Sequence, residues 1–164
     1  MTTVAELYSA LKYRVVVDPD GTRKYFNAAG QLHCEEGPAV IWHNGDCDWY
    51  YNGQLHREDG PAIERSGGSK EWWVHDLLHR EDGPAIVWGN GGKEWWQNGM
   101  RHRLVGPAVT HPDGTTMWYQ NGLRHRVGGP AVIWPDGGSE WWLNDKQYTV
   151  QNYCVKLVAL GLTP

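Results

Sequence analysis

The feature that most constrains the fold of this chain is a repeat with a period of 23 residues. The dipeptide Gly-Pro returns at this interval, a histidine lies four residues before each of its glycines, and an aromatic residue keeps the same register. The glycines are Gly37, Gly60, Gly83, Gly106 and Gly129, the histidines are His33, His56, His79, His102 and His125, and the aromatic residues are Phe26, Trp49, Trp72, Trp95, Trp118 and Trp141. Three residue types in one register indicate a tandem-repeat protein.

Each repeat has the pattern of a β-hairpin. Pro-Ala-Val or Pro-Ala-Ile starts a short extended run, and proline is tolerated as the first residue of a strand. A turn such as Pro112-Asp113-Gly114 follows, and a second extended run ends in an aromatic pair such as Trp95-Trp96. Residues 14–17 and 22–27 add one hairpin at the start, with a register one residue longer. We therefore predict a mainly β fold, a single-layer twisted antiparallel array of about twelve short strands.

Both ends of the chain predict helices. Thr3 and Glu6 fit a capping box, and apolar stripes with helical spacing run through residues 4–11 and 150–158. Helices at both ends would cover the unpaired N–H and C=O groups of the outermost strands. We expect helices over residues 3–13 and 149–160, in an N-terminal capping segment at 1–13, repeats at 14–146 and a C-terminal capping segment at 147–164.

The segments 94–102 and 117–125 resemble the MORN repeat, which has a Trp/Tyr-x-Asn-Gly-x-x-His-Gly core. The resemblance covers about residues 20–146. It implies a solenoid with one hairpin per unit, as in scaffold proteins, some of which contact acidic lipids. Arginine follows the histidine where the family has glycine, at Arg57, Arg80, Arg103 and Arg126. The variant motif His-Arg-Glu-Asp-Gly-Pro-Ala resembles repeats of tailed bacteriophages and bacteria, which implies a viral or prokaryotic source.

The charge of the chain is divided unevenly along its length. Residues 1–90 carry 8 Lys/Arg and 14 Asp/Glu, whereas residues 91–164 carry 7 and 5, so the formal net charge of −4 is the sum of −6 and +2. This balance gives no strong signal for nucleic acid or an anionic membrane. Three cysteines without metal-type spacing and no charged-then-apolar leader predict a reduced cytoplasmic protein, in the host cytoplasm if the source is viral. No apolar run reaches the roughly 18 residues that a membrane-spanning helix needs.

The two residues of the aromatic pair point to opposite faces of a strand. We expect the first position to form a packed ladder in the core, made of Trp49, Trp72, Trp95, Trp118 and Trp141. The second position is either a second packed layer or an exposed face that binds a protein or stacks on bases. Its members are Asn27, Tyr50, Trp73, Trp96, Tyr119 and Trp142.

The histidine ladder has a structural interpretation. Equivalent histidines in neighbouring hairpins would lie about 9–10 Å apart, which is too far for them to share one metal ion. We expect each imidazole to hydrogen-bond its own Gly-Pro loop. None of the serines, Ser9, Ser66, Ser69 and Ser139, lies on a nucleophile elbow, and no glycine-rich loop opens a helix to hold phosphate. The sequence thus predicts no catalytic residue, no metal site and no cofactor.

The loops that carry the histidines differ between repeats. Two of them read Leu-His-Arg-Glu-Asp-Gly, whereas the next two lose the acids and gain an arginine before the histidine. Because arginine suits phosphate and carboxylate, we predict an anion or partner site there, unless the charges are simply solvated or paired with Asp113, Asp136 or Glu140. The predicted site comprises Arg101, His102, Arg103, Arg124, His125 and Arg126, together with the second-position residues Trp73, Trp96 and Tyr119.

A longer period of 46 residues is superimposed on the repeat. The fourth residue after each Gly-Pro glycine alternates between apolar and polar, at Ile41, Glu64, Val87, Thr110 and Ile133. The next residue alternates between tryptophan and a polar residue, at Trp42, Arg65, Trp88, His111 and Trp134. These tryptophans lie at the ends of alternate hairpins, here named the tryptophan tips. Either the tips contact a partner or a second subunit, or they pack over the sheet of their own chain. A homo-oligomer therefore stays open at this point.

These patterns favour a non-enzymatic binding protein that engages a protein partner. If the viral resemblance holds, a host defence protein is the natural target. The alternative is a sponge that sequesters a phosphate-bearing nucleotide signal, with arginines on the phosphates and Trp96 or Tyr119 stacked on the base. An enzyme is the third hypothesis and requires a nucleophile that the sequence does not display.

Overall fold

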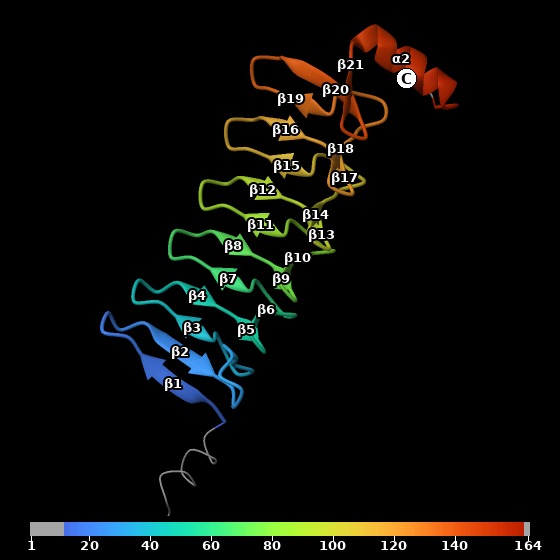
Figure 1. The fold of residues 1–164 in the computed structure, drawn as a ribbon. Helices are drawn as coiled ribbons and strands as arrows, with labels where there is room; N and C mark the ends of the chain where they lie inside the picture. Colours follow the sequence, from blue (N-terminus) through green and yellow to red (C-terminus); the bar gives the residue numbers. More distant parts are fainter. Residues whose placement is uncertain (1–11, 163–164) are drawn as a thin grey trace, which may run out of the picture. The chain divides into compact units, whose positions relative to one another are not determined.

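The computed structural model describes residues 12–162 (Figure 1). Over these residues the protein is mainly β and consists of antiparallel hairpins followed by helix α2 (Val150–Ala159). This confirms the predicted fold class and the expected C-terminal helix, which begins at the N-cap Thr149. Most of the helix expected over 3–13 lies outside the described residues, and Lys12 and Tyr13 form a bend instead.

The chain divides into two compact units, and the first comprises Met1–Leu77. Six of its strands follow one another in the order β1-β2-β3-β4-β7-β8. Their bounds are Arg14–Val17, Arg23–Phe26, Val40–Ile41, Cys47–Asp48, Ile63–Glu64 and Lys70–Glu71. A narrow hairpin pairs β5 (Tyr50–Tyr51) with β6 (Gln54–Leu55), and β9 (Trp73–Val74) and β10 (Leu77–Leu78) come at the end of the unit.

The second unit comprises Leu78–Pro164 and repeats the same plan. Seven strands follow one another in the order β11-β12-β15-β16-β19-β20-β21. Their bounds are Ile86–Val87, Lys93–Glu94, Val109–Thr110, Thr116–Met117, Val132–Ile133, Ser139–Leu143 and Lys146–Tyr148. Two narrow hairpins pair β13 (Trp96–Gln97) with β14 (Met100–Arg101) and β17 (Tyr119–Gln120) with β18 (Leu123–Arg124). In each unit the wide turns and the narrow hairpins lie at opposite ends of the strands (Figure 1).

Two kinds of turn set the length of the repeat. At the wide turn, the N–H of His111 donates to the Thr115 carbonyl at 2.9 Å, and Gly114 takes a positive φ of 94°. This is a three-residue loop with glycine at the left-handed position, as the Pro-Asp-Gly sequence predicted. At the narrow turn, Asn121 and Gly122 have φ values of 50° and 82°, which is the type I′ geometry that Asn-Gly favours.

The strand with the aromatic pair is interrupted at its first aromatic residue. Trp95 lies between β12 and β13, where its N–H donates to the Ala108 carbonyl at 2.7 Å and its own carbonyl accepts the N–H of His102 at 3.0 Å. In the first repeat the residue with these bonds is Tyr25, not Phe26, because its N–H donates to the Ala39 carbonyl. The extra residue in the loop after β2 therefore shifts the aromatic register by one, and Phe26 takes the second position.

The buried column is not the tryptophan ladder that the sequence predicted. The alanines of the Gly-Pro-Ala motif have no exposed surface, and the residue after each alanine is also buried, whereas the first-position tryptophans are half-buried. The alanines are Ala39, Ala62, Ala85, Ala108 and Ala131. A methyl group can be fully enclosed between adjacent strands, but a ring as large as indole keeps an exposed side on a single sheet.

Helix α2 covers the end of the second unit. Tyr153 and Leu157 are buried against Leu143, and the Tyr153 ring lies 4.8 Å from that of Trp141. The Tyr153 hydroxyl donates to the Arg126 carbonyl at 2.6 Å. The helix therefore covers the last tryptophan of the ladder, as the capping prediction required.

Candidate functional site in the His-Arg loops

The segments from each ladder histidine to the following Gly-Pro glycine are here named the His-Arg loops. Complete His-Arg loops span residues 56–60, 79–83, 102–106 and 125–129, and the first repeat has Cys34 in place of the arginine. Each loop begins where a narrow hairpin ends and leads into the buried alanine. Each loop is therefore fixed at one end by a narrow hairpin and at the other by the buried alanine.

The histidine of each loop holds the turn of the next repeat. The Nδ1 atom of His102 accepts the N–H of Asn121 at 3.1 Å, and that of His125 accepts the N–H of Asn144 at 3.3 Å. In the first unit, Nδ1 of His33 accepts the N–H of Asn52 at 3.0 Å. The predicted structural role of the histidines fits these bonds, but the predicted partner, the histidine's own Gly-Pro loop, was wrong. The physical reason is that the narrow hairpins are adjacent, so each imidazole meets the turn 19 residues later.

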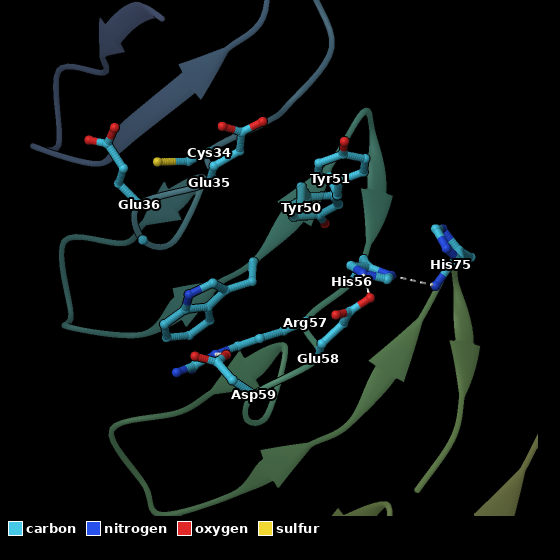
Figure 2. A pocket seen from close by; sticks show the side chains of 12 residues that line it. Cys34, Glu35, Glu36, Tyr50, Tyr51, His56, Arg57, Glu58, Asp59 and His75 are labelled. Carbon is cyan, nitrogen blue, oxygen red and sulfur yellow. Dashed lines mark hydrogen bonds and ion pairs between the residues drawn. The ribbon is translucent and has the colours of Figure 1, made fainter. Parts of the chain in front are cut away.

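One histidine departs from this pattern. At the third repeat His75 replaces the asparagine, and its ring stacks on that of His56 with 4.3 Å between centroids (Figure 2). The N–H of His75 approaches Nδ1 of His56 at 3.4 Å. Burial, and then the charge of His75, lower the pKa of His56 below its usual value of 6.5. The neutral imidazole that this contact requires is therefore favoured.

The arginine of each loop stacks on the first-position tryptophan of its own repeat. The guanidinium carbon lies 4.2 Å from the ring centre in the Arg57–Trp49 pair, 3.8 Å in the Arg103–Trp95 pair and 3.9 Å in the Arg126–Trp118 pair. In the same loops Nη1 donates to the proline carbonyl four residues later, at 3.2, 2.9 and 3.0 Å. A cation over an indole ring is attractive, and here it also fixes the plane of the guanidinium.

The acidic partner of this arginine is present in only some of the loops. Nε of Arg57 donates to Oδ1 of Asp59 at 2.8 Å, and Nε of Arg80 donates to Oδ1 of Asp82 at 2.8 Å. In the next two loops the residue at the position of this aspartate is valine or glycine. Arg103 and Arg126 accordingly have no ion pair among residues 12–162.

The two arginines before the histidines do have counter-charges, which corrects the sequence-based expectation. Nε of Arg101 donates to Oε2 of Glu94 at 3.0 Å, and its guanidinium lies over the ring of Trp96 at 5.0 Å. Nε of Arg124 lies 3.6 Å from Oδ1 of Asp145. Strand pairing across the narrow hairpin places Arg101 opposite Trp96, and so beside the carboxylate two residues before that ring.

The second-position aromatic residues are half-buried and neither fully packed nor fully open. The indole Nε1 of Trp73 donates to Glu71 at 2.9 Å, and that of Trp96 donates to Glu94 at 3.1 Å. The hydroxyl of Tyr119 points to the sulfur of Met117 at 4.0 Å. The sequence contained a signal for this, because the acid and the second tryptophan recur two residues apart and hence on one face of the strand.

The 46-residue alternation has an internal explanation at two of the tryptophan tips. Nε1 of Trp42 donates to the buried carboxylate of Asp48 at 2.7 Å, and Nε1 of Trp88 donates to Glu94 at 3.3 Å. At the polar tip between them, Arg65 donates to the other oxygen of Asp48 at 2.5 Å. The tips therefore satisfy buried acids, which favours the second of the two alternatives drawn from the sequence.

A groove lies beside the stacked tryptophan in each unit. In the first unit it has a volume of about 810 Å³, and carboxylates line it from two sides, Glu35 and Glu36 on one and Glu58 and Asp59 on the other (Figure 2). The groove in the second unit is smaller, about 420 Å³, and lies between residues 80–83 and 102–105.

The second groove is flanked by apolar residues that project into solvent. Leu104 is 74% exposed and Val105 is 83% exposed, while Val127 in the next loop is 43% exposed. The corresponding residues of the second loop are Glu58 and Asp59. The loops 102–106 and 125–129 therefore combine an arginine that has no ion pair among the described residues with exposed aliphatic side chains.

Burial raises the pKa of the Cys47 thiol, which is opposite to the shift of an activated nucleophile. In the described part of the chain, no group of three or more His, Cys, Asp or Glu residues could hold a metal ion. Likewise, no helix within residues 12–162 has the length and apolarity to cross a membrane.

Comparison with known proteins gives no further assignment. No protein-family model matches the chain, and no curated protein matches it in sequence. The resemblance to MORN repeats therefore stays a prediction that rests on the motif residues alone.

Proposed function

We propose that this chain is a non-enzymatic binding protein that engages a protein partner through its fourth and fifth His-Arg loops, residues 102–106 and 125–129. The observation that carries the proposal is the exposure of Leu104 and Val105, at 74% and 83%, in a loop that elsewhere carries Glu-Asp. Acids at these positions are compatible with the fold, as Glu58 and Asp59 demonstrate. Aliphatic side chains here therefore contribute nothing that the fold itself requires.

The energetics favour a macromolecular partner. An aliphatic side chain gains about 1.5–3 kcal/mol when it passes from water to a fully buried site, so two adjacent ones could anchor an interface. Arginine and tryptophan are enriched among the residues that dominate binding energy, and Arg103 stacked on Trp95 lies in the same loop region. An interface with an apolar centre and a charged rim fits this arrangement.

The rival proposal is a sponge for a phosphate-bearing nucleotide. Arg103 and Arg126, which stack on tryptophan and have no ion pair among residues 12–162, support it. Two contacts weaken the sponge proposal. Arg101 is paired with Glu94, and the indole N–H of Trp96 donates to the same carboxylate. Arg101 also lies over the rings of Trp96 and Tyr119, at 5.0 and 5.5 Å from their centres, so a base would compete with this guanidinium for those faces. If the resemblance to bacteriophage repeats holds, the partner is a bacterial host protein.

The test compares two matched exchanges of loop sequence. Leu104→Glu with Val105→Asp gives the fourth loop the acids of the second loop, and Glu58→Leu with Asp59→Val makes the reverse change in the first unit. Each exchanged sequence already occurs in this chain, so both variants should fold. Partners captured from bacterial lysate by the wild type are identified by mass spectrometry and then purified for calorimetric titration.

We expect affinity for the purified partner to fall at least about tenfold in the first variant and to change less than about twofold in the second. Equal affinity in all three proteins would contradict the proposal. A thermal shift with nucleotides that disappears in the Arg103→Gln variant, without any protein partner, would favour the sponge.

A further inference from the structure

The second and third His-Arg loops, residues 56–60 and 79–83, show which ligand an arginine in this position takes. Nε of Arg57 donates to Oδ1 of Asp59 at 2.8 Å while Nη1 donates to the Pro61 carbonyl and the ring of Trp49 holds one face of the guanidinium. Arg80 makes the same Nε bond to Asp82 at 2.8 Å in the second unit. The chain therefore contains two copies of an arginine that is completed by a carboxylate.

Arg103 and Arg126 make the same contacts with a tryptophan ring and a proline carbonyl, but none with a carboxylate of the described residues. Their guanidinium groups stack on Trp95 and Trp118, and Nη1 of each donates to a proline carbonyl. Because Val105 follows Arg103 at the position of the aspartate, no carboxylate of the described residues bonds to Nε of either arginine.

The other acids of the second unit are engaged elsewhere. Asp113 and Asp136 each accept an N–H within their own turn, at 2.8 Å in both cases. Glu140 accepts the indole N–H of Trp142 at 2.8 Å, and Glu94 accepts Arg101. Pairing of the loop arginines with Asp113, Asp136 or Glu140, which the sequence left open, does not occur in the structure.

We infer that Arg103 and Arg126 each bind a carboxylate from an acidic segment of the partner protein, which takes the place that Asp59 and Asp82 occupy in their own loops. This inference rests on the proposed function and specifies the chemistry of its partner. The free edge of each guanidinium, Nε with Nη2, presents two parallel donors that match the two oxygens of a carboxylate. Leu104, Val105 and Val127 would contact apolar residues between or beside the acids.

The repeat also determines the spacing of the carboxylates. Equivalent residues of neighbouring hairpins are separated by two strand spacings, or about 9–10 Å. Acids three residues apart on a polyproline II segment lie on one face at about the same distance, because this helix has three residues per turn and advances about 3.1 Å per residue. One phosphate cannot bridge arginines so far apart, whereas two carboxylates on one peptide can reach both. A carboxylate is also the ligand that Arg57 and Arg80 take at this position.

A short peptide tests this inference without knowledge of the natural partner. The probe is acetylated, amidated Gly-Glu-Leu-Val-Glu-Gly, which has acids three residues apart with apolar residues between them. Its matched control has both glutamates replaced by glutamine. Binding is followed through the Nε–H resonances of the arginines in ¹⁵N-labelled full-length protein, and inorganic phosphate is titrated in a separate arm.

We expect the Nε–H signals of Arg103 and Arg126 to shift with the glutamate peptide and not with the glutamine peptide. The Leu104→Glu/Val105→Asp variant should lose the Arg103 shift and bind the peptide about tenfold more weakly. The Glu58→Leu/Asp59→Val variant should acquire a new response at Arg57, a gain that misfolding cannot imitate.

Two results would overturn the inference. One is the absence of any shift at Arg103 and Arg126 in the wild-type protein at millimolar peptide. The other is an equal response to inorganic phosphate at the same concentration, which would assign the arginines to a phosphate ligand. If the peptide fails while capture of a protein partner still depends on Leu104 and Val105, the proposed function stands and only the acidic chemistry of the partner is refuted.

Discussion

Replacement of Glu94 by methionine should destabilise the protein strongly, although Glu94 has no part in the proposed site. Its carboxylate is buried, with the residue only 7% exposed, and accepts bonds from Trp88, Trp96 and Arg101. Methionine occupies the equivalent position in the next repeat, Met117, so its shape is compatible with the sheet. The substitution therefore removes the acceptor without an obvious steric conflict.

The size of the effect can be worked out from these bonds. A hydrogen bond to a charged group contributes about 1.5–3 kcal/mol, and Glu94 accepts two from indole N–H groups. The ion pair with Arg101 adds less, because that side chain is 38% exposed and its charge is screened by water. Trp88 is 39% exposed, so its indole can recover a bond to water after the exchange. We therefore expect a loss of about 2–4 kcal/mol in the free energy of unfolding.

Urea unfolding followed by circular dichroism measures this loss as a shift of the midpoint at unchanged slope. The control is Glu81→Met, which removes the same charge from a side chain that is 84% exposed and should change stability by less than about 0.5 kcal/mol. A Glu94→Met protein within about 0.5 kcal/mol of the wild type would refute the view that buried acids organise the aromatic face.

Three further predictions test local features. Burial and the charge of His75 lower the pKa of His56, so the neutral form of His56 stabilises the fold fully above pH 6.5. This stabilisation is lost as the pH falls from 6.5 through the lower folded-state pKa. Urea midpoints of the His56→Gln variant should therefore fall less steeply over this range than those of the wild type, and parallel curves would contradict the prediction. Tyr153→Phe should cost about 1–3 kcal/mol in urea unfolding, because it leaves the Arg126 carbonyl without the buried hydroxyl, and no loss would mean that water replaces the bond. Gly137→Ala should lower the free energy of unfolding by about 1–2 kcal/mol, because Gly137 has a positive φ of 86° and no atom lies near the added methyl group. The control Gly67→Ala has no positive φ and should not destabilise the protein. Equal melting temperatures of the two variants would refute backbone strain at Gly137.

The sequence alone was sufficient for the repeat, the hairpins and the turns. These features depend on chemistry within a few residues: Asn-Gly allows the two positive φ angles of a type I′ turn, and Pro-Asp-Gly allows the wide turn. Each local signal is also repeated at the same interval, so one ambiguous repeat is corrected by the others. The strands 14–17 and 23–26 and the helix from 150 to 159 were located for the same reason.

The tertiary structure decided which side chains meet. At Trp95 the chain leaves the sheet and enters the narrow hairpin, which pairs Trp96 with Arg101 and so brings Arg101 to Glu94. The first tryptophans stay half-buried, whereas the alanines are fully buried. Strict period-two alternation along the sequence cannot show that break, since it depends on a backbone bond to Ala108 in the next hairpin.

The candidate site shows the same division. The sequence showed that the fourth and fifth loops lack acids. It did not distinguish Arg101 and Arg124 from Arg103 and Arg126, and all four were predicted to form the site. Only the structure separates the two pairs. Arg101 meets Glu94 and Arg124 meets Asp145 in the next turn, whereas Arg103 and Arg126 stack on tryptophan and lack the aspartate that completes Arg57. Side-chain pairing of this kind depends on distances between chain segments, which residue spacing does not contain.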